Sequence, residues 1–263
     1  YERCPQCGGI MKHIGTGTQK VEEELHALFP GAKVLRMDTD TVGASHGHEK
    51  LLRQFEEEKI PILLGTQMVA KGLDFENVTL VGVLCADASL YIDNYRAPER
   101  TFSLLSQVVG RAGRGSKQGR AIIQTFTPEN EVIRAAAAQD YDAFYESEIR
   151  MRRLRRYPPF ADLFSFTVTG ADESRVIRAA KALRDALGYA VERREELKPL
   201  SIEVLGPAGA SVVKVNNRYR YRVFLVGKGC PALRRLVAEY LYAFYQHKEN
   251  RGLDIFADCN AIQ

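Results

Sequence analysis

The chain has 263 residues, of which 45% are hydrophobic and 27% charged, the composition of an ordinary globular protein with one or two domains. No apolar run approaches the ~20 residues of a membrane-spanning helix and no signal peptide opens the chain, so we expect a cytoplasmic protein without a membrane partner. The five cysteines are odd in number and scattered, which argues against a disulfide framework and favours a reducing compartment.

Charge is divided unevenly along the chain. Residues 151–263 contain 20 Lys and Arg against 12 Asp and Glu (net +8), whereas residues 1–150 contain 17 against 21 (net −4). A basic second half indicates a polyanionic partner for that half, and the alternative is an ordinary fluctuation of surface charge.

Two cysteines near the start have the spacing of a zinc knuckle. Cys4 and Cys7, separated by Pro-Gln and followed by two glycines, could supply two thiolates to one zinc ion. A tetrahedral site needs four ligands, and His13 is better explained as a surface residue. We therefore expect residues 1–13 to be the remnant of a zinc module whose other cysteines lie upstream, in a longer protein of which this chain is a fragment.

Residues 14–155 show helices alternating with strands. The first predicted helix begins with Thr18 as its N-cap and buries a stripe formed by Val21, Leu25, Leu28 and Phe29. The later elements are predicted as a strand at 34–38, a helix around 51–55, strands at 62–65 and 78–85, a helix at 101–109, a strand at 120–126 and a helix at 129–153. This alternation predicts an α/β fold with a doubly wound parallel sheet, in which the apolar strand 78–85 is covered on both faces.

Polar residues follow several of these strands, and in such a sheet the carboxyl ends of the strands form the functional edge. They are Asp38-Thr39-Asp40-Thr41, Gly65-Thr66-Gln67, Gly72-Leu73-Asp74 and Asp87. Each could equally be a capping or turn residue, but together they indicate one half of a cleft for nucleotide and nucleic acid.

The stretch from Gln107 to Arg114 offers one amide and two guanidinium groups beside glycines. A planar guanidinium binds two phosphate oxygens at once, which suits it to a developing phosphoryl charge. The stretch resembles the last motif of superfamily 2 helicases, in which arginines reach the γ-phosphate of ATP held by another lobe. A capped helix end with basic residues near its dipole is the alternative.

A phosphate-binding loop is absent from the sequence. Gly110 to Gly115 has the glycine spacing, but Ser116 stands where lysine is required. The chain is therefore expected to complete an ATP site that another lobe builds.

Residues 156–263 are predicted to form a second domain. A boundary is placed near Tyr157-Pro158-Pro159-Phe160, because neither helix nor strand accommodates paired prolines in its interior. The order that follows is strand, helix, strand, strand, helix, strand, typical of a ferredoxin-like (S10-like) α+β sandwich. Its elements are predicted at 163–168, 173–194, 201–205, 219–226, 231–246 and 253–256.

Arginine and tyrosine alternate from Arg218 through Arg220 to Arg222. In a strand the arginines then share one face and the tyrosines the other. This pattern suits a phosphate backbone or an acidic peptide, and an equally good reading is a strand with its tyrosines packed inward and a solvated basic face.

Five strings together resemble the bacterial primosomal replication-restart helicases, over essentially the whole chain. They are Arg36 to Thr41, Gly65 to Gly72, Arg96-Ala97-Pro98-Glu99-Arg100, Gln107 to Arg114, and Tyr157 to Phe160. One departure is that the family usually ends in Asp-Val-Asp-Pro, where this chain has Asp258-Cys259-Asn260-Ala261.

The resemblance implies the second, RecA-like motor lobe and the C-terminal domain of an ATP-dependent 3′-to-5′ DNA helicase. By the pattern of these helicases, Arg114 is the arginine finger, Arg111 is its companion and Gln107 senses nucleotide. Gly72 and Asp74 then lie near the ribose, and Thr66 and Gln67 face DNA. Further contacts with DNA are expected from Arg218, Arg220 and Arg222. Implied cofactors are Mg-ATP, bound mainly by a missing first lobe, and zinc at Cys4 and Cys7.

Implied partners are branched and single-stranded DNA, the acidic tail of single-stranded DNA-binding protein and other primosome proteins, at the nucleoid. The isolated chain is expected not to hydrolyse ATP. Two alternatives stay open: a module that binds DNA or acidic peptides without catalysis, and another superfamily 2 helicase acting on RNA.

Overall fold

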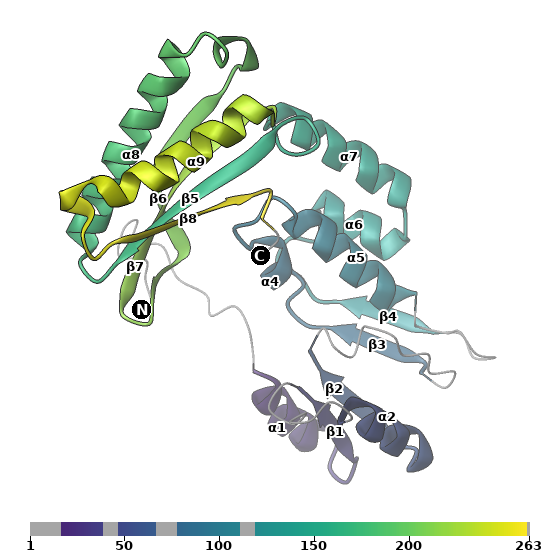
Figure 1. Cartoon of the computed structure of the whole chain (residues 1–263). Helices are drawn as coiled ribbons and strands as arrows, with labels where there is room; N and C mark the ends of the chain where they lie inside the picture. The colour runs from purple at the N-terminus through teal and green to yellow at the C-terminus, as the bar shows by residue number, and fades with distance from the viewer. Residues whose placement is uncertain (1–16, 39–46, 67–77, 111–118, 262–263) are drawn as a thin grey trace. The chain divides into compact units, whose positions relative to one another are not determined.

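The computed structural model (Figure 1) describes residues 17–38, 47–66, 78–110 and 119–261. These residues form two compact units. The first holds the described residues up to Ile92 together with Arg96–Tyr145, and the second holds Asp93–Tyr95 and Glu146 onwards. None of the described helices is long and apolar enough to cross a bilayer.

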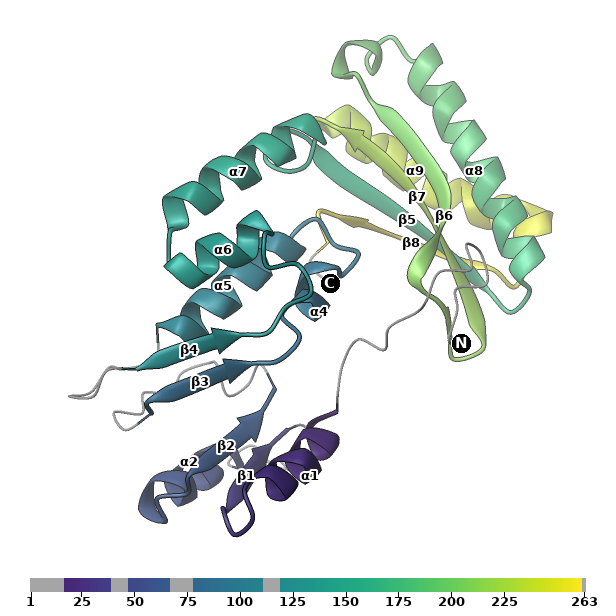
Figure 2. The same ribbon diagram turned by 180° about the vertical axis from the view of Figure 1, so that it is seen from behind.

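The first unit alternates strands with helices, as the sequence predicts for an α/β fold (Figure 2). Strand β1 pairs in parallel with β2, and β3 pairs in parallel with β4. The elements are α1 (Thr18–Leu28), β1 (Val34–Met37), α2 (Gly47–Glu57), β2 (Ile62–Gly65), β3 (Leu80–Val83), α4 (Asp87–Leu90), α5 (Ala97–Val109), β4 (Arg120–Ile123) and α6 (Glu131–Ala138), followed by α7 (Tyr141–Leu154), whose residues divide between the two units.

Helix α1 differs from its prediction in two respects. Thr18 is not the N-cap; Gly17 holds that position, and the Thr18 hydroxyl instead donates to Asp38 Oδ2 at 2.6 Å. The predicted apolar stripe is incomplete, because Leu28 and Phe29 are 71% and 52% exposed. The expected cover on both faces of the third strand is also wrong for β3, where Leu80 is exposed.

The single helix predicted at 129–153 is two helices, α6 and α7. Asn130 caps α6 by accepting the N–H of Val132 at 3.0 Å, and the chain turns at Gln139, whose φ of 55° lies in the left-handed region. Asp140 then accepts the N–H of Ala143 at 2.9 Å and starts α7. The break is made by two side-chain caps and one residue that leaves the helical conformation.

Helix α5 is buried against α6 and the start of α7. Leu105 and Thr101 are almost wholly inaccessible, and the ring of Phe102 stacks on that of Phe144 with centroids 4.2 Å apart and planes 10° apart. Stacked aromatic pairs of this kind contribute about 0.5–1.5 kcal/mol beyond their buried area. This packing fixes α5 relative to α6 within the first unit.

Asp87, at the start of α4, binds the segment that follows β4. Its carboxylate accepts hydrogen bonds from the Thr125 hydroxyl (3.0 Å), the Phe126 N–H (2.9 Å) and the Thr127 hydroxyl (2.7 Å). Burial by itself would raise the pKa of Asp87, but the hydrogen bonds outweigh it and the pKa lies below its ordinary value.

The second unit is a four-stranded antiparallel sheet with two helices. Its strand order is β6-β7-β5-β8, in which the first and third strands of the unit are adjacent, as the split β-α-β pattern predicts. Its elements are β5 (Asp162–Gly170), α8 (Glu173–Arg193), η1 (Lys198–Leu200), β6 (Glu203–Val215), β7 (Arg218–Gly227), α9 (Pro231–Gln246), η2 (Lys248–Asn250) and β8 (Asp254–Cys259).

Helices α8 and α9 cover one face of this sheet (Figure 1), and the core lies between them and the strands. Phe166 and Val168 of β5 meet Val223 and Leu225 of β7 in this layer, and all four side chains are inaccessible to solvent. At roughly 1.5–3 kcal/mol per fully buried large apolar side chain, this layer is the main source of stability in the unit.

Asn260 closes the sheet at the carboxyl end of β8. Its side-chain oxygen accepts the Leu163 N–H at 2.8 Å, and its amide donates to Asp162 Oδ1 at 2.6 Å. The other oxygen of Asp162 accepts the Gly229 N–H at 2.8 Å. One amide–carboxylate pair therefore joins the start of β5, the end of β8 and the turn before α9.

Replacing Asp87 with Asn places an amide among three donors, and we expect a loss of about 1–3 kcal/mol in the free energy of unfolding at pH 7. The pKa of Asp87 is lower in the folded than in the unfolded protein, so its carboxylate stabilises the fold fully above the unfolded pKa of about 3.9. That stabilisation is lost as the pH falls through the folded pKa. Urea unfolding at several pH values should show the variant approaching wild type in acid. Asp142→Asn, at an exposed position, is the control and should stay within about 0.5 kcal/mol.

Replacing Asn260 with Asp sets two carboxylates against each other. The shared pKa then rises, so the variant should be least stable at neutral pH and recover as pH falls towards about 4. Asn260→Ala, which removes the hydrogen bonds without adding charge, should lose stability equally at both pH values. The double variant Asp162→Asn with Asn260→Asp restores one amide and one carboxylate, so its stability should depend less on pH than that of the single Asn260→Asp variant. If the stability of both variants depended equally on pH, repulsion between the two carboxylates would not be the cause.

Candidate nucleotide and nucleic-acid sites

Several predicted site residues lie outside the part of the chain that the structure describes. They are the zinc candidates Cys4 and Cys7, the ribose candidates Gly72 and Asp74, Gln67, and the two arginines Arg111 and Arg114. Their roles stay predictions. What the structure does describe is the scaffold immediately before or after three of these segments.

Thr66 directly follows β2 and is exposed. Its neighbour in the sheet is the end of β1, because Gly65 pairs with Met37. Since parallel strands end at the same edge, Thr66 lies at the carboxyl edge of the β1–β2 pair, where the sequence places it. An exposed hydroxyl there is free to meet a ligand on that edge.

Gln107 lies in the last turn of α5, exposed, and its side-chain amide donates to the Ser103 hydroxyl at 3.3 Å. The helix ends at Gly110, whose N–H donates to the Ser106 carbonyl at 2.9 Å. The amide of Gln139 donates to the same carbonyl at 3.2 Å. The end of α5 is thus held by a residue from the turn after α6.

Gly110 lies close to this capping amide. A Cβ at that position would lie 2.8 Å from Gln139 Nε2, so any larger residue would push the capping amide away. Sequence reasoning missed Gln139, because residues 129–153 read as one helix and glutamine gives no signal for a left-handed turn. The glycine of the helicase-like motif has ordinary right-handed helical angles (φ −66°, ψ −7°), so the reason for it that the structure shows is packing.

Two of the strand-end aspartates are engaged within their own unit. Asp38 is buried and is contacted by the Thr18 hydroxyl and, at 3.1 Å, by Arg36 Nε, while Arg36 also reaches Glu22 Oε2 at 2.9 Å. Asp87 holds the segment after β4. Both carboxylates are thus engaged inside the first unit, Asp87 with the turn after β4 and Asp38 with side chains of other elements, whereas Asp40 lies outside the described residues.

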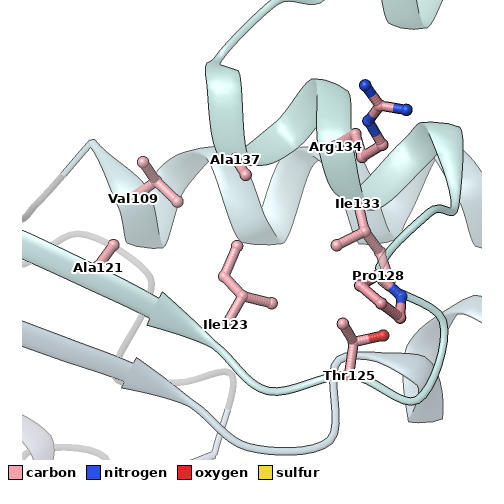
Figure 3. Close-up of a pocket in the computed structure, with 8 residues that line it drawn as sticks. All are labelled: Val109, Ala121, Ile123, Thr125, Pro128, Ile133, Arg134 and Ala137. Carbon is pink, nitrogen blue, oxygen red and sulfur yellow. The ribbon is translucent and has the colours of Figure 1, made fainter.

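An open pocket of about 430 Å³ lies beside the end of α5 (Figure 3). It is lined by Val109, Ala121, Ile123, Thr125, Pro128, Ile133, Arg134 and Ala137. Among these, Arg134 is the one ionisable side chain, and in the close-up its guanidinium points away from the aliphatic floor. The described lining holds no acid–base pair, and the hydroxyl of Thr125 donates to Asp87.

The alternation of arginine and tyrosine in β7 is confirmed. Tyr219 and Tyr221 pack against the core beneath the helices. The Tyr221 hydroxyl donates to Glu173 Oε1 at 2.8 Å, and this bond, followed by burial, raises the pKa of Tyr221. The arginines lie on the opposite face, with Arg220 opposite Thr169 and Arg222 opposite Thr167.

That basic face is only partly solvated. Arg218 forms an ion pair with Asp254 and donates to the Thr169 carbonyl at 3.2 Å. Arg222 is only 8% exposed, whereas Arg220 is half-buried. The interpretation as a solvated basic face is therefore wrong for Arg222, and Arg220 is the arginine of the three best placed to contact a ligand without giving up an internal ion pair.

Comparisons with known proteins divide the chain in the same order. The helicase conserved C-terminal domain matches residues 14–116, and the primosomal protein N C-terminal domain matches residues 153–260.

Three relatives share the name replication restart protein PriA. The chain is 41% identical to that of Bacillus subtilis over 98% of its own length and 31% of the relative. It is 40% identical to the protein of Synechocystis, over 84% of the present chain and 26% of the relative. It is 37% identical to the protein of Treponema pallidum, over 92% of the present chain and 36% of the relative. The chain spans about a third of the length of the relatives it matches.

These matches agree with the five sequence strings and with the order of the two units. The chain carries the helicase conserved C-terminal domain and the primosomal protein N C-terminal domain, and over both of them it is similar to the PriA replication restart proteins.

Proposed function

We propose that this chain is the second motor lobe and C-terminal domain of an ATP-dependent 3′-to-5′ DNA helicase that restarts stalled replication forks and assembles the primosome. The observation that carries the proposal is the succession, in one chain, of a helicase C-terminal domain and a primosomal C-terminal domain. The proposed domains are a zinc-module remnant at 1–13, the motor lobe at 14–155 and the C-terminal domain at 156–263.

The absence of a phosphate loop from the sequence indicates which part of the ATP site this chain contributes. With Ser116 in place of the lysine, ATP and Mg²⁺ are held by a lobe outside this chain, and the chain contributes guanidinium groups to the γ-phosphate. Arg114 is the proposed arginine finger and Arg111 its companion, because a planar guanidinium stabilises charge that develops on the transferred phosphoryl group. The isolated chain then does not hydrolyse ATP.

The described scaffold supports this assignment at one point. Gln107 and the end of α5 precede the two arginines by a few residues, and that end is capped by Gln139 and buried at Leu105. A rigid helix end is what an arginine finger requires, since misplacement by about 1 Å can cost about 10²-fold in rate. Closure on ATP and reopening after hydrolysis would move the two lobes along a strand.

The remaining roles follow from the resemblance. Gly72 and Asp74 contact the ribose, Thr66 and Gln67 face a DNA phosphate, and Cys4 and Cys7 give two of the four ligands of a zinc ion. The partners are branched and single-stranded DNA, the acidic tail of single-stranded DNA-binding protein and other primosome proteins, in the cytoplasm at the nucleoid.

A second candidate is a binding module that uses the basic face of β7. Arg220, half-buried and opposite Thr169, supports it, because a cation on a sheet face can meet a phosphate or a carboxylate. The two candidates are compatible, since the chain can bind DNA while the full-length enzyme hydrolyses ATP.

Arg114→Ala in the full-length enzyme should lower DNA-stimulated ATP hydrolysis by about 10³-fold or more, since an arginine finger contributes about 10³–10⁵. Binding to a forked DNA should be unchanged, because Arg114 meets the nucleotide and not the strand. Steady-state hydrolysis and fluorescence anisotropy measure the two. Arg120→Ala, at the exposed start of β4, is the matched control; hydrolysis by the Arg114 variant within a few-fold of this control would refute the assignment.

Arg220→Glu in the 263-residue chain should weaken salt-dependent binding to single-stranded DNA or to an acidic peptide, because it reverses a cation on the β7 face. Arg222 is left in place, since charge reversal at a buried site would destabilise the fold. Arg184→Glu on α8 provides the charge-matched control. Equal affinities for the two variants would remove β7 from the binding surface.

A further inference from the structure

The carboxyl end of α7 and the turn that follows it carry five arginines within residues 150–156, with no acidic residue among them. Two of the five are used inside the second unit. Arg152 pairs with Glu148 Oε1 at 2.6 Å and donates to the Pro158 carbonyl at 3.2 Å. Arg156 donates to the Ser201 carbonyl at 2.6 Å and pairs with Glu203 at 3.2 Å.

The other three arginines, Arg150, Arg153 and Arg155, are exposed. Arg150 bonds the Glu146 carbonyl of its own helix through Nε at 3.2 Å, and none of the three forms an ion pair with any residue in the described ranges. Adjacent like charges without counter-charges repel one another, so three such cations within six residues destabilise the fold. No carboxylate of the described residues balances these three charges, whereas Arg152 and Arg156 each have one.

Exposed apolar side chains lie among these cations. Leu154 is 77% exposed and follows Arg150 by four residues, one helical turn, so both share a face of α7. Phe160 is 38% exposed, and the guanidinium carbon of Arg153 lies 5.0 Å from its ring centroid. The α7 patch is defined here as Arg150, Arg153, Leu154, Arg155 and Phe160.

The chemistry of the α7 patch selects its ligand. Regularly spaced anions would neutralise the three cations, and flat apolar groups would cover Phe160 and Leu154. Single-stranded DNA supplies both, because its phosphates repeat along the strand and its unpaired bases stack on aromatic rings and guanidinium planes. Duplex DNA supplies the phosphates alone, because its bases are stacked on one another.

We propose that the α7 patch is a binding site for single-stranded DNA, in which Arg150, Arg153 and Arg155 contact phosphates and Phe160 stacks on a base. The inference deepens the proposed function and rests on it for the choice of a DNA partner. It concerns residues other than the β7 arginines and other than those proposed for the nucleotide site.

The test compares charge-matched triple variants of the 263-residue chain. Arg150→Gln with Arg153→Gln and Arg155→Gln should weaken binding to a fluorescein-labelled oligothymidylate about tenfold or more. The slope of log K against log salt should fall by about 2, since each phosphate contact on a single strand contributes about 0.7. The control replaces Arg178, Arg184 and Arg193 of α8 with Gln, which removes the same total charge. Arg193 lies over the ring of Tyr189, so the control, like the test variant, also removes one contact between a guanidinium and an aromatic ring.

The stacking step is tested separately. Phe160→Ala should weaken binding about fivefold or more without changing the salt slope, because base–aromatic stacking contributes about 1–3 kcal/mol and no counterion release. Tyr189→Ala is its control on α8. Circular dichroism and thermal unfolding of each variant show that the fold is retained.

Three results would overturn the proposal: no binding by the wild-type chain, equal losses in the α7 and α8 triple variants, or equal affinity for duplex and single-stranded DNA. Competition by polyglutamate as strong as by oligothymidylate would also overturn it and indicate an acidic protein partner. The proposed helicase function is tested independently by ATP hydrolysis in the Arg114→Ala enzyme, so either idea can fail alone.

Discussion

The packing of α5 against α6 and the start of α7 is the interaction on which the functional interpretation of the first unit depends. The two arginines proposed for the γ-phosphate follow this helix in the sequence, and a guanidinium can stabilise a phosphoryl group only when the element that carries it is fixed. The stacked rings of Phe102 and Phe144 and the buried Leu105 fix α5 within the first unit. The Gln139 amide, which lies beside Gly110, also donates a hydrogen bond to the end of the helix.

A turn residue far from any motif therefore holds the end of α5. Gln139 adopts a left-handed conformation, which costs a non-glycine residue roughly 1–2 kcal/mol, and it gains one hydrogen bond to the end of α5. The same turn ends α6 and allows α7 to begin at a new angle. The left-handed backbone of Gln139 and the hydrogen bond from its side chain to the end of α5 therefore belong to the same turn.

The long periodic elements of the second unit were predictable from the sequence. Helix α9 has the predicted bounds, because Pro231 fits the first turn and the apolar spacing continues to Gln246. Strand β6 is longer than predicted, since the small residues at 206–211 in its middle carry little periodic signal. In the first unit the break at Gln139 is made by local caps, and the contact between Thr18 and Asp38 depends on a tertiary partner; periodicity reveals neither.

The candidate site could be predicted only where a motif string carried it. The arginine pair, the ribose candidates and the zinc cysteines were identified from spacing and resemblance, and their geometry is not part of the described structure. For the aspartates at the strand ends, position in the sequence indicated a ligand contact that the fold does not leave available. Asp38 and Asp87 stand where a ligand contact is expected, yet each carboxylate is occupied by hydroxyl, amide or guanidinium donors of its own unit.

Arginines show most clearly what a structure adds to a sequence. The run at 150–156 appears as one basic segment, and the alternation in β7 appears as three equivalent cations. In the fold, Arg152 binds acceptors in its own helix and the turn after it, and Arg156 and Arg218 bind acceptors brought close by tertiary structure. Arg150, Arg153 and Arg155 form no ion pair with the described residues. An arginine that satisfies a buried carbonyl contributes to stability, and one that repels its neighbours at the surface contributes to stability only when an anion is bound. Within a basic run, the arginines without an ion pair to the described residues are therefore the ones at which a polyanionic ligand gains the most.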